Sequence, residues 1–115
     1  MQTNIIINLQ TEGLHHWPEA KNVLPQVGYL SNLHRHIFHI ECKINVTHDN
    51  RDIEFIDLKH KIYDYLTKSY YDSVYFCLNF NARSCEMIAK ELFEKFNLNY
   101  CKVLEDNENG AEVKK

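Results

Sequence analysis

Two histidines separated by one residue, His34 and His36, are the side chains best suited to chemistry in this sequence. Side chains two positions apart in a β-strand lie on the same face, so both imidazoles could bind one metal ion, whereas His39 belongs to the opposite face. His15 or His16 could supply a third ligand. Three histidines and a water molecule would form a zinc site of the catalytic type. The alternative is that the histidines form hydrogen bonds with backbone or carboxylate groups at the end of the sheet.

Three arginines form a second group of candidate ligand-binding residues. Arg51 and Arg83 each lie beside turn residues at the end of a predicted strand, and Arg35 lies between the two histidines. Guanidinium groups match the geometry of phosphate and carboxylate, and loops carry a large share of ligand contacts. Arg51 or Arg83 could instead pair with Asp52, Glu54 or Glu105 within the fold. Taken together, the three arginines predict a rim that binds an anion.

The segment from Tyr70 to Phe80 is rich in aromatic residues. Such rings could stack on a purine or a pterin, but the alternation of Phe76 and Phe80 with polar neighbours favours a place in the core or in a subunit interface. Phe80 and the following Asn81 are retained as candidate ligand contacts. The sequence has no glycine-rich phosphate loop, and no serine or cysteine has an adjacent base in sequence, so it identifies no nucleophile.

Length and composition are those of an ordinary globular domain, with 115 residues, a formal net charge of -3 and 25% charged residues. We expect one domain, residues 1–115, and a homo-oligomer, either a dimer or a hexamer, because an elaborate site in so small a chain would need a second subunit. The charge does not predict a DNA- or RNA-binding surface. No apolar run approaches the roughly 18 residues of a membrane span, so we expect a cytoplasmic protein without a membrane partner. The four scattered cysteines predict buried, reduced thiols.

Hydrophobic periodicity predicts the elements that must position these residues. The clearest strand covers residues 34–47, with Phe38 on its dry face. Residues 11–13 are expected to end the first strand, and Asn109-Gly110 is a hairpin signal before a loose C-terminus. Strands are predicted over residues 4–9, 34–47, 53–56, 73–80 and 99–105, and helices are predicted near Asp57 and after a Ser84 cap. The fold class is therefore α+β, a mostly antiparallel sheet of about four or five strands with two helices packed on one face.

One resemblance comes from His34-Arg35-His36 opening a strand and from residues 53–59 opening a helix. This pattern resembles the tunnelling-fold family of 6-pyruvoyl and carboxy-tetrahydropterin synthases, in which an HxH zinc pair precedes a strand. The resemblance aligns residues 84–89 with the start of the family's second helix and places Glu105 where an acidic residue anchors the pterin. No cysteine lies between His16 and His34, and no Asp-His pair follows the first helix, so the family's usual acid/base residues are missing.

A second resemblance rests on residues 34–39, 48–56, 84–89 and 105–111. Together these stretches are similar to small bacteriophage proteins of the first anti-Thoeris family. That family sequesters cyclic ADP-ribose isomers and, in some members, cyclic oligonucleotides. The resemblance implies an oligomer that holds an unaltered nucleotide between subunits.

The leading prediction is a non-enzymatic phage anti-defence protein that sequesters a cyclic nucleotide immune signal in the host cytoplasm. Such a protein needs complementarity to a ground state rather than to a transition state, and the missing nucleophile and acid/base residues agree with that requirement. The arginines would bind phosphate and an aromatic ring would stack on the base. The candidate ligand-binding residues are Arg35, Arg51, Phe80, Asn81, Arg83 and Glu105.

Two alternatives stay open. The first is a diverged zinc-dependent enzyme of the pterin synthase type, with zinc bound by His34, His36 and either His16 or His15. The second is a phage structural or host-interaction module without a small ligand. In the leading prediction the protein needs no cofactor, and in the first alternative it needs zinc.

Overall fold

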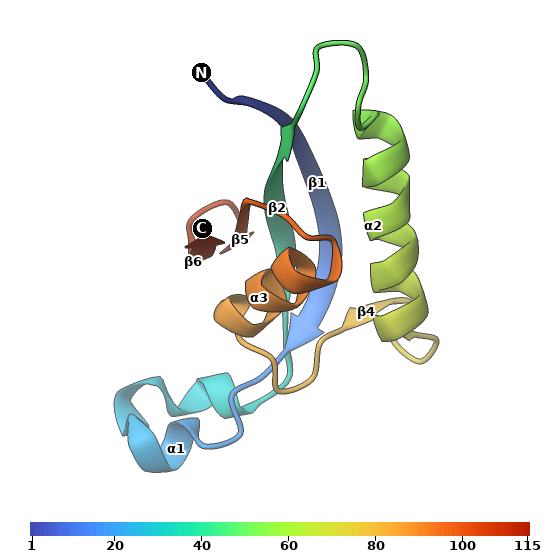
Figure 1. Cartoon of the computed structure of the whole chain (residues 1–115). Coiled ribbons are helices and arrows are strands. Elements are labelled where there is room, and N and C mark those ends of the chain that lie inside the picture. The colour runs from blue at the N-terminus through green and yellow to red at the C-terminus, as the bar shows by residue number, and fades with distance from the viewer.

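The fold is built around a six-stranded sheet in the order β3-β4-β1-β2-β5-β6, seen here in a computed structural model that describes residues 1–115. All neighbouring strands are antiparallel except β1 and β4. Figure 1 shows β1 and β2 as a long ribbon, with α2 and α3 beside it. The elements are β1 (Thr3–His15), α1 (Ala20–Val23), the 3-10 helix η1 (Pro25–Ser31), β2 (His34–Val46), α2 (Phe55–Tyr70), β3 (Tyr71–Asp72), β4 (Cys77–Asn79), α3 (Cys85–Lys95), β5 (Tyr100–Glu105) and β6 (Asn109–Lys114).

The predicted α+β class is confirmed, because both long helices bury their apolar stripes in one core on one face of the sheet. Ile62 of α2 and Leu92 of α3 are fully buried in the same cluster as Phe38 and Ile40 of β2. The sheet has six strands, more than the four or five predicted. Part of the excess is β6, which lies in the tail predicted to be loose and forms a hairpin with β5.

The first strand is longer than predicted, because the sequence around Gly13 does not break it. β1 pairs with β2 along thirteen residues, from Thr3 opposite Val46 to His15 opposite His34. A Cβ atom on Gly13 would lie 2.9 Å from the rings of both Phe38 and Phe80. The glycine therefore makes room for two core rings instead of marking a turn.

A capping contact explains why residues 53–56 do not form the predicted strand. Glu54 precedes α2, and its side chain accepts hydrogen bonds from the backbone N–H groups of Ile56 and Asp57. These bonds satisfy donors that the first helical turn leaves unpaired, so the helix begins at Phe55, two residues before the predicted start. The Ser84 cap of α3 is confirmed, since its hydroxyl accepts from the backbone N–H of Met87.

The strand predicted over residues 73–80 is mostly a turn. β3 and β4 form a short hairpin of two and three residues, and Val74, Tyr75 and Phe76 at its tip are exposed. Asp72 holds this turn by accepting a hydrogen bond from the backbone N–H of Val74. The local turn therefore overrides the strand preference of these apolar residues.

Tyr63 of α2 covers the edge of β1 that β4 leaves free. β4 pairs with β1 only at Gly13 and Leu14. Further along that strand, the Tyr63 hydroxyl accepts from the backbone N–H of Gln10 at 3.3 Å and donates to the carbonyl of the same residue at 2.8 Å. A helix side chain thus satisfies backbone groups that would otherwise be available to another strand.

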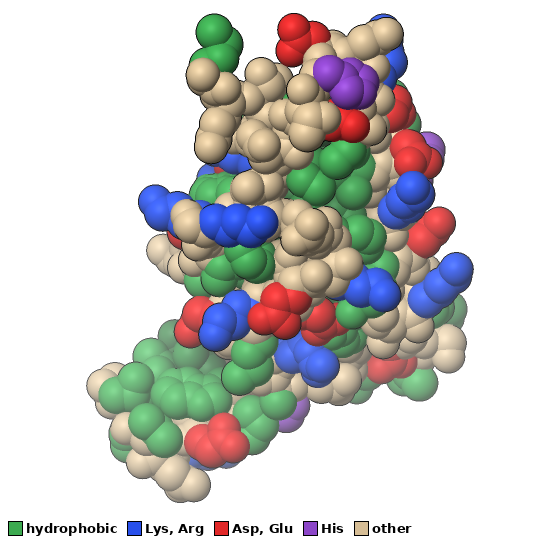
Figure 2. Space-filling model, in the orientation of Figure 1, with side chains coloured by type: hydrophobic (Ala, Val, Ile, Leu, Met, Phe, Trp, Pro, Cys, Tyr) green, Lys and Arg blue, Asp and Glu red, His purple; other side chains and the backbone are tan.

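The segment containing α1 and η1 projects from the end of the β1–β2 ribbon (Figure 1). Figure 2 shows hydrophobic side chains gathered over this projection, and Val23, Leu24 and Tyr29 are among its exposed apolar residues. Both ends of the segment are tied to the sheet, because His16 precedes it and His34 follows it. No helix of the chain combines the length and apolar character needed to cross a lipid bilayer.

Candidate metal and ligand site

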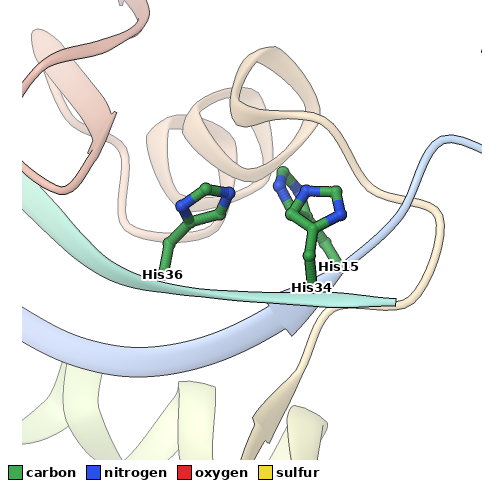
Figure 3. Close-up of side chains that lie close together, drawn as sticks. All are labelled: His15, His34 and His36. Carbon is green, nitrogen blue, oxygen red and sulfur yellow. The ribbon is translucent and has the colours of Figure 1, made fainter. Parts of the chain in front are cut away.

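Three histidines converge where β1 ends and β2 begins. His15 is the last residue of β1 and lies opposite His34 in the ladder, and His36 follows two residues later on the same face. One ring nitrogen from each histidine lies within 4.8 Å of those of the other two. Figure 3 shows the three imidazoles on the side of the ribbon that faces α3.

The Nδ1 atom of each of these rings is engaged by an oxygen atom. His15 Nδ1 lies 2.9 Å from the carbonyl of Arg83, and His34 Nδ1 lies 2.8 Å from the carbonyl of Asn32. His36 Nδ1 lies 2.7 Å from Oδ2 of Asp106. An Nδ1–H that donates to oxygen fixes the tautomer in which Nε2 carries the free lone pair, as in metal-binding histidines.

The Nε2 atoms of His15 and His36 are buried and make no well-directed hydrogen bond. His15 is only 7% exposed, so water does not readily satisfy this nitrogen. Buried polar atoms without well-directed hydrogen bonds are rare and costly in folded proteins, so these two nitrogens indicate a candidate ligand site. Three imidazole donors with this orientation fit the ligand preferences of Zn²⁺, which binds histidine nitrogen at about 2.0–2.1 Å.

The third imidazole is that of His15, whereas the predicted alternative His16 turns away. His16 Nδ1 lies 3.3 Å from the carbonyl of Ser31, and its backbone N–H donates to the carbonyl of Asn81. The signal for choosing His15 was present in the sequence. If the alternation of Ile5, Ile7 and Leu9 is continued, every odd position of β1 faces the core, and His15 is one of them.

The carboxylate of Glu105 lies against the triad from the end of β5. Its Oε2 atom is 2.8 Å from Nε2 of His15, and its Oε1 atom is 3.4 Å from Nε2 of His36. The contact with His15 holds the pKa of Glu105 below its usual value. Burial opposes protonation of His15, but Glu105 and the Arg83 carbonyl outweigh that cost and raise the pKa of His15. Burial lowers the pKa of His34.

A cavity of about 730 Å³ opens beside the triad. Its lining includes His15 and Glu105, the aromatic Trp17, Arg83 from the loop before α3, and Cys85 at the start of α3. Its volume falls within the range of small-molecule sites, roughly 300–1,000 Å³. Burial raises the pKa of the Cys85 thiol to about 12, so this cysteine is a neutral thiol rather than a thiolate nucleophile.

The three arginines predicted to form an anion rim lie in different places. Arg35 is on the outer face of the sheet, where it pairs with Glu12. Arg51 lies in the loop after β2, beyond a strand of thirteen residues that spans roughly 40 Å. Arg83 alone lines the cavity, and its Nε atom donates to Glu91 at 3.1 Å.

Two other predicted ligand contacts are occupied by the fold. Phe80 is fully buried, with ring centroids of Phe38 and Tyr70 at 5.1 and 4.8 Å. Asn81 adopts a left-handed backbone with φ of 55°, and its carbonyl accepts from His16. Among the predicted ligand residues, Arg83 and Glu105 are the two that line the cavity. The four cysteines are buried and free, as predicted.

Two residues that orient this site were not predicted, Asp106 and Cys85. Asp106 binds the backbone N–H of Ile37 as well as the ring of His36, and the Cys85 thiol donates to Oε2 of Glu105 at 3.7 Å. The acidic residues after Glu105 were visible in the sequence, but Asp106 contacts residues about seventy positions away, so the sequence did not indicate its role.

Comparison with known proteins places this geometry in a familiar fold. No family model matches the sequence, and no curated protein matches it. Among solved structures, the chain is similar to 6-pyruvoyl tetrahydropterin synthase from Caenorhabditis elegans, with a TM-score of 0.72 and 14% sequence identity over 100% of this chain and 96% of that one. The predicted resemblance to the tunnelling fold is therefore confirmed for the fold, and the resemblance to anti-Thoeris proteins stays a prediction. This chain has the fold of the 6-pyruvoyl tetrahydropterin synthases.

Proposed function

We propose that this protein binds zinc through His15, His34 and His36. The observation that supports the proposal is the shared arrangement of the three rings. Each Nδ1 lies beside an oxygen, and one ring nitrogen of each histidine lies within 4.8 Å of those of the other two. The buried Nε2 atoms of His15 and His36 face the Glu105 carboxylate, at 2.8 and 3.4 Å, rather than a backbone group. When bound, zinc would supply a Lewis acid beside the cavity.

We further propose that the cavity beside the triad binds a pterin-type small molecule, as part of a diverged pterin synthase-like activity. The fold and the cavity volume support this proposal. Trp17 offers an aromatic face, and Arg83 offers a guanidinium group for an anionic substituent. Cys85 and Glu105 are the groups that could hold or pass a proton there, since the thiol already donates to the carboxylate.

Metal analysis of the purified protein tests the zinc proposal. We expect about one zinc per chain in the parent and much less in His36→Ala. His39→Ala is the matched control, because His39 lies on the same strand but on the opposite face. Equal zinc in both variants would contradict the proposed ligand set. Incubation with a pterin triphosphate, followed by chromatography of the products, tests the proposed activity.

Sequestration of a cyclic nucleotide is the second candidate function. Its support is that Arg83 and Trp17 line the same cavity, where they could contact a phosphate and a base. Thermal shift with cyclic ADP-ribose isomers and cyclic oligonucleotides tests it. We expect the melting temperature to rise with the bound nucleotide, and the ligand to be recovered unaltered after denaturation. Turnover of the ligand would contradict sequestration.

A homo-oligomer is part of both proposals. The outer edge of β6 is unpaired, and the projection carrying Val23, Leu24 and Tyr29 exposes apolar surface. Light scattering coupled to size-exclusion chromatography would measure the mass of the particle against the 13.7 kDa of one chain. A monomer at all concentrations would contradict this part of the proposals.

A further inference from the structure

The carboxylate of Glu105 lies against two of the three triad imidazoles. Its two carboxylate oxygens reach two different imidazoles, with Oε2 at 2.8 Å from Nε2 of His15 and Oε1 at 3.4 Å from Nε2 of His36. These two nitrogens are the ones that lack a directed hydrogen bond. The carboxylate thus bridges two of the three imidazoles at the wall of the cavity.

The backbone holds Glu105 in this place. Glu105 lies opposite Phe38 in the ladder between β2 and β5. Because His36 is two residues from Phe38 in β2, the side chains of Glu105 and His36 lie on the same face of the sheet. The next residue, Asp106, donates its backbone N–H to the carbonyl of Ile37 and contacts Nδ1 of His36. Consecutive carboxylates therefore face the two nitrogens of one ring.

A second group, the thiol of Cys85, also holds the carboxylate. The Cys85 thiol, at the first residue of α3, donates to Oε2 at 3.7 Å. Cys85 is 6% exposed, so it is fixed by packing. A carboxylate that is oriented by its own hydrogen-bond donor has the arrangement found around metal ligands.

We propose that Glu105 is the fourth ligand of the zinc ion held by His15, His34 and His36. This inference rests on the proposed zinc site and specifies it further. Three neutral imidazoles leave the charge of Zn²⁺ uncompensated, and one carboxylate at the fourth position reduces that charge and completes a tetrahedron. The site is then closed at rest, and a small molecule reaches the metal only by displacing Glu105. The resemblance had given Glu105 the different role of a pterin anchor.

Cobalt substitution tests the inference, because the visible spectrum of Co²⁺ reports coordination independently of activity. The parent, Glu105→Gln and the control Glu86→Gln are loaded with Co²⁺ and titrated with azide. Glu86 lines the same cavity but makes no hydrogen bond or ion pair with the triad. We expect azide to leave the spectra of the parent and the control unchanged and to alter that of Glu105→Gln. Co²⁺ affinity should fall by at least about 10-fold in Glu105→Gln, the lower end of what loss of an outer-shell partner costs.

The outcomes separate this inference from the proposed function. A parent spectrum that responds to azide overturns the fourth ligand while the metal site stands. An intense near-ultraviolet sulfur-to-cobalt band that disappears in Cys85→Ser also overturns it, because the fourth ligand would then be the thiol. Absence of cobalt or zinc binding by the parent overturns the proposed function itself. If Glu105→Gln does not fold, the azide response of the parent alone still decides the inference.

Discussion

Histidines lie at both ends of the β1–β2 ribbon, but only at one end do three of them lie close together. At the end near α3, His15 and His36 contact groups 68 and 70 residues away in the chain. At the other end, the ring of His48 contacts the backbone N–H of Asn50 and lies 3.6 Å from Asp52, within four residues. Long-range partners require the whole fold to be in place, whereas local partners require only a turn.

This difference distinguishes a candidate metal site from a polar loop. His48 is more than half exposed, so water satisfies its nitrogens without cost. His15 is almost completely buried, its Nδ1 contacts the Arg83 carbonyl, and its Nε2 lies 2.8 Å from the Glu105 carboxylate. A metal site is expected where hydrogen bonds made by the fold fix one nitrogen of a buried imidazole and orient the other nitrogen toward further ligands.

Removal of one triad imidazole is expected to have the largest effect. His15→Ala should lower zinc affinity by at least roughly 100-fold, because loss of a ligand costs no less than loss of an outer-shell partner. His48→Ala should leave zinc affinity unchanged. Competition with a chromophoric chelator measures both values. A comparable loss in both variants would remove the distinction between the two ends of the ribbon.

The next largest effect is expected from crowding the core beneath the triad. In Gly13→Ala the new methyl group would lie 2.9 Å from two fully buried rings, so the free energy of unfolding should fall by about 1–3 kcal/mol. Gly28→Ala is the control, since its nearest neighbour is the flexible side chain of Lys21 at 3.2 Å. Urea unfolding measures both variants. An unchanged midpoint for Gly13→Ala would show that the rings can move.

A smaller effect is expected from the residue that orients His36. Asp106→Asn keeps an oxygen for the backbone N–H of Ile37 but weakens the contact with Nδ1 of His36, so zinc affinity should fall by about 10-fold. Asp52→Asn changes a carboxylate at the other end of the ribbon and should have no effect on zinc. Isothermal titration calorimetry compares the two variants, and equal affinities would contradict a role for Asp106.

The smallest effect concerns the dependence of stability on pH. Burial opposes ionisation of Glu91, but hydrogen bonds from Tyr65, Tyr70 and Arg83 outweigh burial and lower its pKa below 4.5 in the folded state. A depressed carboxyl pKa adds stability above about pH 4.5, and this stability is lost as the pH falls through the folded value. Glu91→Gln should therefore lose less stability between pH 7 and pH 3 than the parent.

Urea midpoints at the two pH values measure this difference. Glu94→Gln, one turn away on the same helix and exposed, should behave as the parent. An equal acid-induced loss of stability in the parent and in Glu91→Gln would show that the half-buried Glu91 carboxylate does not contribute.

Local sequence patterns were sufficient for the strands and helices that carry the core. Alternation predicted β2 and the shared face of His34 and His36, and the Ser84 cap predicted the start of α3. The break predicted at Gly13 was wrong because the need for a glycine came from two aromatic rings that arrive from other elements. No local pattern contains that information.

The partners of the site were harder to predict for the same reason. Glu105 reaches His15 only because β5 pairs with β2 and β2 pairs with β1, so the contact depends on two registers at once. Arg51 was a plausible ligand residue by composition, yet its position depends on the length of β2, which carries it away from the triad.

The contact between Tyr63 and Gln10 also affects how this chain avoids self-association. An exposed strand edge is a template for aggregation, and β1 is the longest edge that this sheet could present. With the Tyr63 hydroxyl bound to both backbone groups of Gln10, a foreign strand could add there only after α2 had moved. The Tyr63 contact therefore opposes the addition of a foreign strand at this part of β1.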